Sequence, residues 1–169
     1  MDNSCLLVDL GTMGNMETWS IQKFIAKLRY RNELNDCLIL VQHPHTYTLG
    51  RRGKLSDILV DDSFLELNDI VVHSVDRGGE VTYHGPGQII AYTIFDVRNM
   101  GGVSAFVNFL EEIAIDTLAT LGVRGYRKEN CTGIWVNDAK IASLGLNISR
   151  GITTHGFALN INTDLTYYQ

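Results

Sequence analysis

The chain has 169 residues, of which 45% are hydrophobic and 20% are charged, and this predicts a single globular domain over residues 1–169. Its net charge of -5 argues against nucleic-acid binding as the main function, and no apolar stretch is long enough for a membrane span. The widely spaced Cys5, Cys37 and Cys131 do not resemble a disulfide framework. We therefore expect a soluble cytoplasmic protein with neither a nucleic-acid partner nor a membrane partner.

The first half of the chain predicts several strands and one amphipathic helix. Apolar residues recur mostly at spacings of three and four from Met16 to Tyr30, so one face of a helix there is expected to be buried. The residues of that face are Trp19, Ile21, Phe24, Ile25 and Leu28. Runs of β-forming residues predict strands at 5–10, 37–43, 46–50, 70–75 and 81–83.

The second half predicts a long strand, a second helix and a hairpin. Residues 88–97 are β-prone, 103–121 show a helical stripe, and a turn at Asn137 and Asp138 joins two strands that precede a last one at 154–163. The helical stripe consists of Val103, Phe106, Val107, Leu110, Ile113, Ala114 and Leu118. Two helices among many strands, some of them in hairpins, predict an α/β fold of the α+β type, with helices packed on a mixed β-sheet.

A glycine-rich segment, RGGEVTYHGPGQ at residues 77–88, lies between two β-prone runs. Glycine lets backbone amides come close to a ligand, so the segment is compatible with a phosphate site, a metal site or a pocket for an acyl group. It lacks the lysine–serine ending of a P-loop, and a β-prone run follows it instead of a helix whose N-terminus would attract an anion. The phosphate interpretation therefore loses its main physical support.

The histidines give only weak support to a metal site. Two of the five flank one proline, but no cysteine or H-x-x-x-H partner lies near them, as a zinc site would favour. Polar residues at strand ends are the better interpretation, and we expect no metal and no cofactor. The histidines are His43, His45, His73, His84 and His155.

Two residues are candidates for nucleophilic or base chemistry. Cys131 lies beside basic residues that favour a thiolate, but it precedes a strand and has no histidine near it in sequence, so a structural role is favoured. Lys140 follows the predicted turn among small and apolar residues, where partial desolvation would lower the pKa of its ammonium group toward that of a useful base. A surface lysine whose stem covers apolar residues explains the pattern equally well.

The basic run at 51–54 is best read as a solvated loop.

The glycine-rich segment belongs to a longer pattern. RGGEVTYHGPGQIIAY at 77–92 closely resembles the signature of the lipoyl(octanoyl) transferase family, whose enzymes move octanoyl from acyl carrier protein to lipoyl domains. The resemblance implies the fold of the biotin and lipoate protein ligase superfamily, a mixed sheet with packed helices. Three further segments agree in order: HPHTYTLGRRG at 43–53, TGIWVNDAKIASLGLNISRGITTHG at 132–156 and FALNINTDLTYY at 157–168.

The resemblance also implies roles for individual residues. Lys140 matches the catalytic lysine of the family, which lowers the pKa of a cysteine partner. The implied donor is octanoyl-acyl carrier protein, and the implied acceptors are lipoyl domains of 2-oxoacid dehydrogenase E2 subunits and of glycine cleavage H protein. The residues that match substrate-binding positions are Arg77, Gly78, Gly79, Glu80, Val81, Thr82, Tyr83, His84, Ser143, Leu144, Gly145, Gly156, Phe157 and Ala158.

The implied mechanism is a two-step acyl transfer without ATP. A cysteine thiolate attacks the octanoyl thioester, and the ε-amine of a lipoyl-domain lysine then attacks the acyl-enzyme to form an amide. Lys140 would serve as base, and backbone amides of the glycine-rich segments would stabilise the oxyanion. An apolar slot would contribute about 0.8 kcal/mol of binding free energy for each buried methylene of the octanoyl chain.

The sequence departs from the family pattern at its end. The family's nucleophilic cysteine sits in a Pro-Cys-Gly segment a few residues beyond the stretch that matches 164–168, and this sequence stops at Gln169. We therefore expect the C-terminal part of the domain, with its cysteine, to be missing here, and we do not expect Cys131 to replace it. Two rival functions remain: a non-catalytic module that binds acyl groups or lipoyl domains, and an ATP-dependent lipoate or biotin protein ligase, for which no adenylate-type signature is visible.

Overall fold

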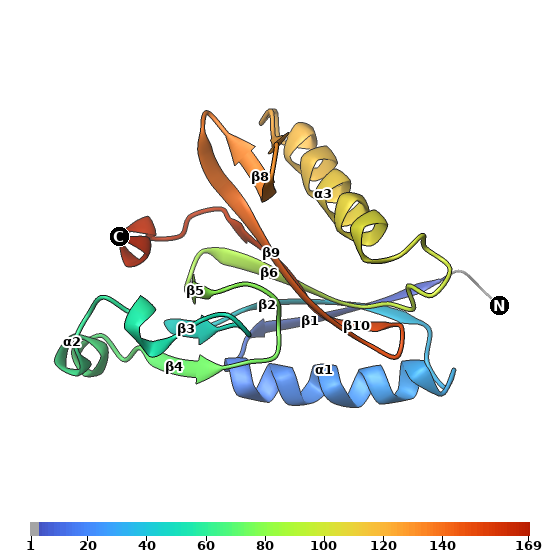
Figure 1. Ribbon diagram of the computed structural model, residues 1–169, viewed down its shortest axis with the longest axis horizontal. Helices are drawn as coiled ribbons and strands as arrows, with labels where there is room; N and C mark the ends of the chain where they lie inside the picture. The colour runs from blue at the N-terminus through green and yellow to red at the C-terminus, as the bar shows by residue number, and fades with distance from the viewer. Residues whose placement is uncertain (1–3) are drawn as a thin grey trace.

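Two β-sheets and two long helices form the structure, a computed structural model that describes residues 4–169 (Figure 1). Within those residues, no helix is long and apolar enough to cross a membrane. The helices are α1 (Asn15–Tyr30), α2 (Asp62–Leu67) and α3 (Val103–Thr120), with short 3₁₀ turns at Leu55–Asp57 and Leu165–Tyr168. The strands are β1 (Cys5–Thr12), β2 (Asp36–Gln42), β3 (Thr46–Leu49), β4 (Val71–Ser74), β5 (Val81–His84), β6 (Gln88–Ile94), β7 (Tyr126–Lys128), β8 (Cys131–Val136), β9 (Ala139–Ser149) and β10 (Ile152–Asn160).

The larger sheet has seven strands in the order β1-β2-β6-β10-β9-β8-β7. Strand β1 runs parallel to β2, and the other neighbours are antiparallel. The smaller sheet has the order β4-β3-β5, in which β3 is parallel to β4 and antiparallel to β5. The structure thus confirms the predicted mixed sheet with packed helices, and it adds a second sheet.

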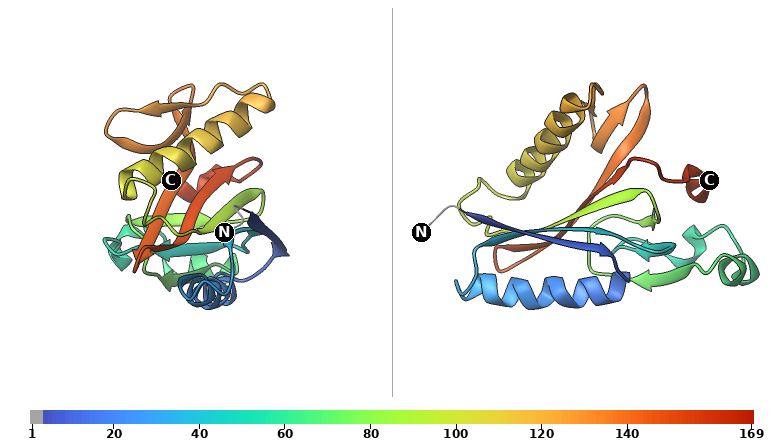
Figure 2. Two further views of the ribbon diagram at one scale, coloured as in Figure 1. Left: turned by 90° about the vertical axis from the view of Figure 1, so that its right-hand side faces the viewer. Right: turned by 180° about the vertical axis from the view of Figure 1, so that it is seen from behind.

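The two long helices pack on opposite faces of the larger sheet. Helix α1 runs along β2, β6 and β10, whereas α3 lies against β8 and β9, and the small sheet sits beyond the start of α1 (Figures 1 and 2). Burying each large apolar side chain contributes about 1.5–3 kcal/mol, so both faces stabilise the fold. The core on the α1 side comprises Ile25, Cys37, Ile39, Val41, Ile90, Tyr92, Ile94, Ile152 and Ala158. The core on the α3 side comprises Val97, Phe106, Leu110, Ala114, Leu118, Ile134, Ala142 and Leu159.

The predicted helices are confirmed, but part of each predicted buried face is wrong. Phe24 is 62% exposed, and on α3 both Val103 and Ile113 face solvent. On α1 the buried positions are Asn15, Thr18, Gln22 and Ile25, spaced by three or four residues, and of these only Ile25 belongs to the predicted face. Asn15 and Gln22 bind partners on strands distant in sequence, whereas Thr18 Oγ1 donates to the Gly14 carbonyl oxygen one turn back. Apolar periodicity alone therefore misjudges which face of the helix is buried.

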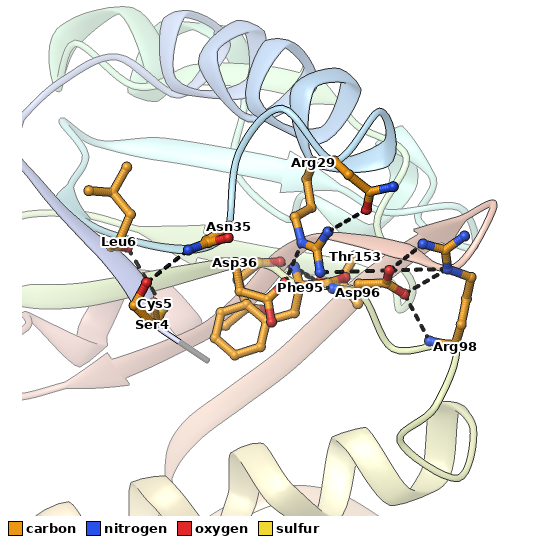
Figure 3. A network of polar contacts seen from close by, with 12 residues as sticks. Ser4, Cys5, Leu6, Arg29, Asn35, Asp36, Phe95, Asp96, Arg98 and Thr153 are labelled. Atoms are coloured by element: carbon orange, nitrogen blue, oxygen red, sulfur yellow. Dashed lines mark hydrogen bonds and ion pairs between the residues drawn. The ribbon is translucent and has the colours of Figure 1, made fainter. Parts of the chain in front are cut away.

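An ionic network ties the end of α1 to the large sheet (Figure 3). Arg29 Nε donates to Asp36 Oδ1 at 2.6 Å, and Arg29 Nη2 lies 3.7 Å from Asp96 Oδ2. The Asp96 amide donates to Asp36 Oδ1 as well, at 3.0 Å. Hydrogen bonds from Arg98 are the main cause of a lowered pKa at Asp96, which therefore stays ionised. The network joins α1, β2 and the end of β6.

Candidate active site

A cavity of about 390 Å³ lies where the two sheets meet the start of α1. Small-molecule sites in proteins are concave pockets of this size class. Of the residues expected to serve substrate binding or catalysis, all but Tyr83 line this cavity. The lining residues that were not expected at the site are Asn15, Thr48, Arg52, Val75, Ile90, Tyr92, Asn130, Thr132 and His155.

Tyr83 points away from the cavity. Successive side chains of a strand face opposite sides, so Tyr83 faces backwards when Thr82 and His84 face the cavity. Its side chain is buried, its hydroxyl lies 2.6 Å from His45 Nδ1, and its ring stacks on Tyr167 with the centroids 4.7 Å apart. Tyr83 therefore supports β5 from behind and does not line the cavity, and its assignment as a substrate contact stays a prediction.

The loop between β4 and β5 is held along its backbone by the segment after β3. Three backbone amides of residues 50–52 donate to carbonyl oxygens of residues 77–80. The side chains of Arg51 and Arg52 are exposed, as predicted for a solvated loop. This pairing extends the small sheet beyond its strands and fixes one wall of the cavity. The pairs are Gly50 to Glu80 at 3.0 Å, Arg51 to Arg77 at 3.0 Å and Arg52 to Gly79 at 3.1 Å.

Glycines are required in this wall. Gly79 has φ +91°, which glycine adopts without strain, and a Cβ added to Gly50 would lie 2.5 Å from the Gly79 carbonyl oxygen. The Gly78 amide donates to the Leu146 carbonyl oxygen at 2.8 Å. This amide is therefore already occupied and not free to stabilise an oxyanion.

Arg77 places a buried positive charge beside the cavity. Its Nη2 donates to the Thr48 carbonyl oxygen at 2.6 Å and to Thr48 Oγ1 at 2.9 Å, while Nη1 donates to the Gly78 carbonyl oxygen at 3.0 Å. Within residues 4–169, no carboxylate lies within ion-pair distance of this guanidinium group. Burial lowers the pKa of Arg77 to about 10, and the group remains a cation at neutral pH.

His84 forms part of the polar floor of the cavity. Its Nδ1 lies 2.7 Å from Gln88 Oε1, and Gln88 Nε2 donates in turn to Asn160 Oδ1 and to the Tyr168 hydroxyl, both at 2.9 Å. Burial lowers the pKa of His84 to about 3. The imidazole is therefore neutral at physiological pH, with Nδ1–H donating to Gln88.

A second polar chain reaches the cavity beside the first, where the ring centroids of His43 and His84 lie 5.7 Å apart. His43 Nδ1 lies 2.6 Å from the Met13 carbonyl oxygen, which can only accept, so Nδ1 carries the hydrogen. Burial lowers the pKa of His43, and its free Nε2 then accepts from the Tyr92 hydroxyl at 2.8 Å. Asn15 Nδ2 donates to the same hydroxyl at 3.4 Å. The chain fixes the orientation of both side chains that line the cavity, Tyr92 and Asn15.

Lys140 lies on the rim of the cavity, near the tip of the β8–β9 hairpin. Its side chain is exposed, which matches the surface-lysine interpretation, one of the two that the sequence leaves open. Its Nζ lies 5.5 Å from the centroid of the Trp135 ring, and a Cβ added to Gly133 would lie 2.8 Å from its Cε. Gly133 thus leaves the space in which the end of the Lys140 side chain lies.

None of the three free cysteines lines the cavity. Cys5 lies on β1, the edge strand four places from β9 in the sheet order. Cys37 is buried under α1, and burial raises the pKa of its thiol to about 11. Cys131 is exposed and lies between two cavity-lining residues, but it borders a separate groove beside α3. The structure therefore offers no cysteine partner for Lys140 among residues 4–169.

The chain from residue 15 to residue 169 matches the family described as the lipoyl protein ligase A/B catalytic domain. A protein of Solibacter usitatus named octanoyltransferase is 44% identical over 167 residues, covering 98% of this chain and 76% of that protein. An octanoyltransferase of Flavobacterium johnsoniae is 38% identical over 185 residues, covering 99% of this chain and 80% of its own. The chain belongs to the octanoyltransferase family. This confirms the resemblance carried by residues 43–53, 77–92 and 132–168.

Solved structures of this fold include protein ligases. A putative lipoate protein ligase from T. acidophilum superposes with a TM-score of 0.75 at 18% identity, covering 96% of this chain and 70% of that one. A lipoate-protein ligase A bound with ATP gives a TM-score of 0.74 at 18% identity, covering 98% of this chain and 69% of its own. At this identity the likeness concerns the fold alone, and it confirms the predicted ligase-like architecture of the octanoyltransferase family member.

Proposed function

We propose that the protein transfers an octanoyl group from octanoyl-acyl carrier protein to a lysine of a lipoyl domain, in the cytoplasm and without ATP. The observation that carries this proposal is the convergence of three separate segments and Lys140 on one cavity in a member of the octanoyltransferase family. Substrates named for the family, the lipoyl domains of 2-oxoacid dehydrogenase E2 subunits and of glycine cleavage H protein, are the acceptors we assign.

The acyl chain has an apolar surface to bind. Side chains from both sheets contribute to it, and burial of each methylene favours binding by about 0.8 kcal/mol. The polar side chains of His84 and Tyr92 line the same cavity, and Arg77 adds a positive charge to its lining. We propose that Arg77 attracts the partly negative carbonyl oxygen of the bound thioester and so favours binding of the acyl donor. The apolar lining residues are Val75, Val81, Ile90, Leu144, Phe157 and Ala158.

The reaction that we propose runs in two balanced steps. A cysteine thiolate attacks the octanoyl carbonyl while Lys140 holds the proton that the cysteine gave up; the bond to the carrier's sulfur then breaks, and the leaving thiolate takes that proton. The neutral ε-amine of the acceptor lysine then attacks the acyl-enzyme, the bond to the cysteine sulfur breaks as the amide forms, and the proton lost by the amine passes through Lys140 to restore the cysteine thiol. Cys5, Cys37 and Cys131 all lie off the cavity, so we assign the nucleophile to none of them and propose instead the cysteine that the family pattern leads us to expect.

Acyl-adduct formation tests this assignment. The 169-residue chain and the full-length gene product are each mixed with octanoyl-acyl carrier protein, and their intact masses are measured before and after hydroxylamine, which cleaves thioesters. We expect one octanoyl adduct, sensitive to hydroxylamine, on the full-length protein only. An adduct on Cys131 of the shorter chain would overturn the assignment of the nucleophile, and binding without any adduct on either protein would support a non-catalytic module.

A further inference from the structure

Asp76, just before the substrate-binding segment, connects the β4–β5 loop to the larger sheet. Its Oδ1 lies 2.7 Å from His155 Nε2 on β10, and its Oδ2 accepts from Asn147 Nδ2 on β9 at 3.0 Å. Two residues along, the Gly78 amide donates to the Leu146 carbonyl oxygen at 2.8 Å. The loop is therefore attached to both β9 and β10.

These attachments lie on one rung of the sheet. Leu146 and His155 are direct partners in the antiparallel pairing of β9 with β10. The side chain of Asp76 binds one member of this pair, and the backbone of Gly78 binds the other. Two attachments on one rung fix both the position and the tilt of the segment from Asp76 to Gly78, in which Arg77 and Gly78 line the cavity.

His155 has an unusual backbone conformation for its residue type. Its φ is 60°, in the left-handed region that residues other than glycine seldom adopt, and such strain concentrates at functional sites. Its amide donates to Gln22 Oε1 at 2.7 Å, so α1 holds this conformation. Its ring centroid lies 6.1 Å from that of Trp19 and 6.0 Å from that of Tyr92. Burial lowers the pKa of His155, so the neutral imidazole donates through Nε2–H to Asp76.

We propose that Asp76 and His155 are positioning residues for the Arg77–Gly79 loop, fixing the cavity wall that the acyl substrate contacts. The identity of the substrate rests on the proposed function, whereas the attachment of the loop does not. A displacement of about 1 Å in a binding wall is enough to weaken productive binding strongly. The pair therefore affects mainly the affinity for the acyl donor, and not the chemical step at Lys140.

Two substitutions at Asp76 separate its contacts. Asp76→Ala removes the acceptors of both His155 and Asn147. Asp76→Asn keeps an oxygen that accepts from His155. Its new amide nitrogen faces Asn147 Nδ2, and two donors cannot form a hydrogen bond with each other. Asp116→Asn is the matched control, because Asp116 is exposed on α3 and makes no side-chain hydrogen bond or ion pair within the described residues.

The variants are compared in the full-length protein by amide hydrogen exchange at Gly78, by thermal unfolding, and by kcat and KM for octanoyl-acyl carrier protein. For Asp76→Ala we expect exchange at Gly78 and KM to rise roughly tenfold, as for loss of a charge-assisted hydrogen bond, with kcat changed less than about twofold. Asp76→Asn is expected to fall between Asp76→Ala and the control.

Unchanged exchange at Gly78 in Asp76→Ala would overturn the proposal. A fall in thermal stability without a rise in KM would also overturn it, because this indicates a merely structural role. A fall in kcat without a rise in KM would do the same, because this indicates a chemical role. If the parent protein transfers no octanoyl group, the proposed function fails. In that case exchange at Gly78 still decides whether Asp76 holds the loop.

Discussion

Lys140 is the residue whose role depends most on placement. It lines the cavity, whereas Lys128, whose Nζ lies 4.7 Å from the centroid of the same Trp135 ring, does not. We expect Lys140→Ala in the full-length protein to lower the rate of octanoyl transfer by at least about a hundredfold, the usual effect of losing a general base. Initial rates at several pH values measure this.

Lys128→Ala is the matched control for Lys140→Ala. It removes an ammonium group that also lies over the Trp135 ring but outside the cavity, so we expect a rate within about twofold of the parent. A Lys140→Ala protein that keeps the parent's turnover and pH dependence would show that Lys140 is not the base.

Side-chain orientation is the level at which sequence and structure differ most. Nearly all of the residues that the family pattern assigned to the site do line the cavity, because those positions carry matching motifs. The pattern could not show that Tyr83 lies off the cavity, since this residue stands in the middle of a matching strand and its side chain faces the side away from the cavity. It also left out Thr48 and His155, although both lie inside segments that carried the resemblance, because their contacts with Arg77 and Asp76 depend on chain pairing across the two sheets.

At the scale of elements, Glu111 fastens α3 to the β7–β8 hairpin. Its buried carboxylate accepts from the Gly133 amide at 2.9 Å and from Arg127 Nε at 3.1 Å. Glu111→Ala leaves the Gly133 amide without its partner, and we expect the free energy of unfolding to fall by about 3 kcal/mol. Urea denaturation followed by circular dichroism measures the change.

Glu112→Ala provides the comparison for Glu111→Ala. Glu112 also pairs with Arg127, at 2.7 Å, but its side chain is 56% exposed, and such surface pairs contribute less than about 1 kcal/mol. Equal losses of stability in the two variants would mean that the hydrogen bond to Gly133 does not anchor the helix.

The elements themselves were largely predictable. Periodicity predicted α1 and α3, and β-forming runs predicted most strands, because both signals are local. The sequence did not predict that β3, β4 and β5 form a separate sheet, since the pairing of 46–49 with 71–74 depends on contacts between distant segments. The polar buried line of α1 was missed for the same reason: Gln22 binds the His155 amide, 133 residues away in the chain.

At the scale of the whole molecule, buried histidines link stability to pH. Burial lowers the pKa of His84 from 6.5 to about 3, so below pH 6.5 the unfolded chain binds a proton that the folded protein does not. Stability therefore falls as pH decreases. We expect His84 alone to reduce the free energy of unfolding by about 2 kcal/mol between pH 7 and pH 5, with His43 and His155 acting in the same direction.

His84→Gln tests this origin of the pH dependence. Glutamine keeps a donor toward Gln88 but does not titrate, so the difference between urea unfolding free energies at pH 7 and pH 5 is expected to shrink by about 2 kcal/mol. The same difference in the variant and in the parent would place the pH dependence elsewhere in the protein.

The central claim concerns the whole molecule: an octanoyltransferase cavity that works by acyl transfer without adenylation. The most direct measurement incubates the full-length gene product with octanoyl-acyl carrier protein and a lipoyl domain, with and without ATP, and follows the mass of the lipoyl domain. We predict a gain of one octanoyl group on the lipoyl-domain lysine at the same rate in both mixtures. A gain that requires ATP and free octanoate, or no gain from a folded protein, would contradict the account.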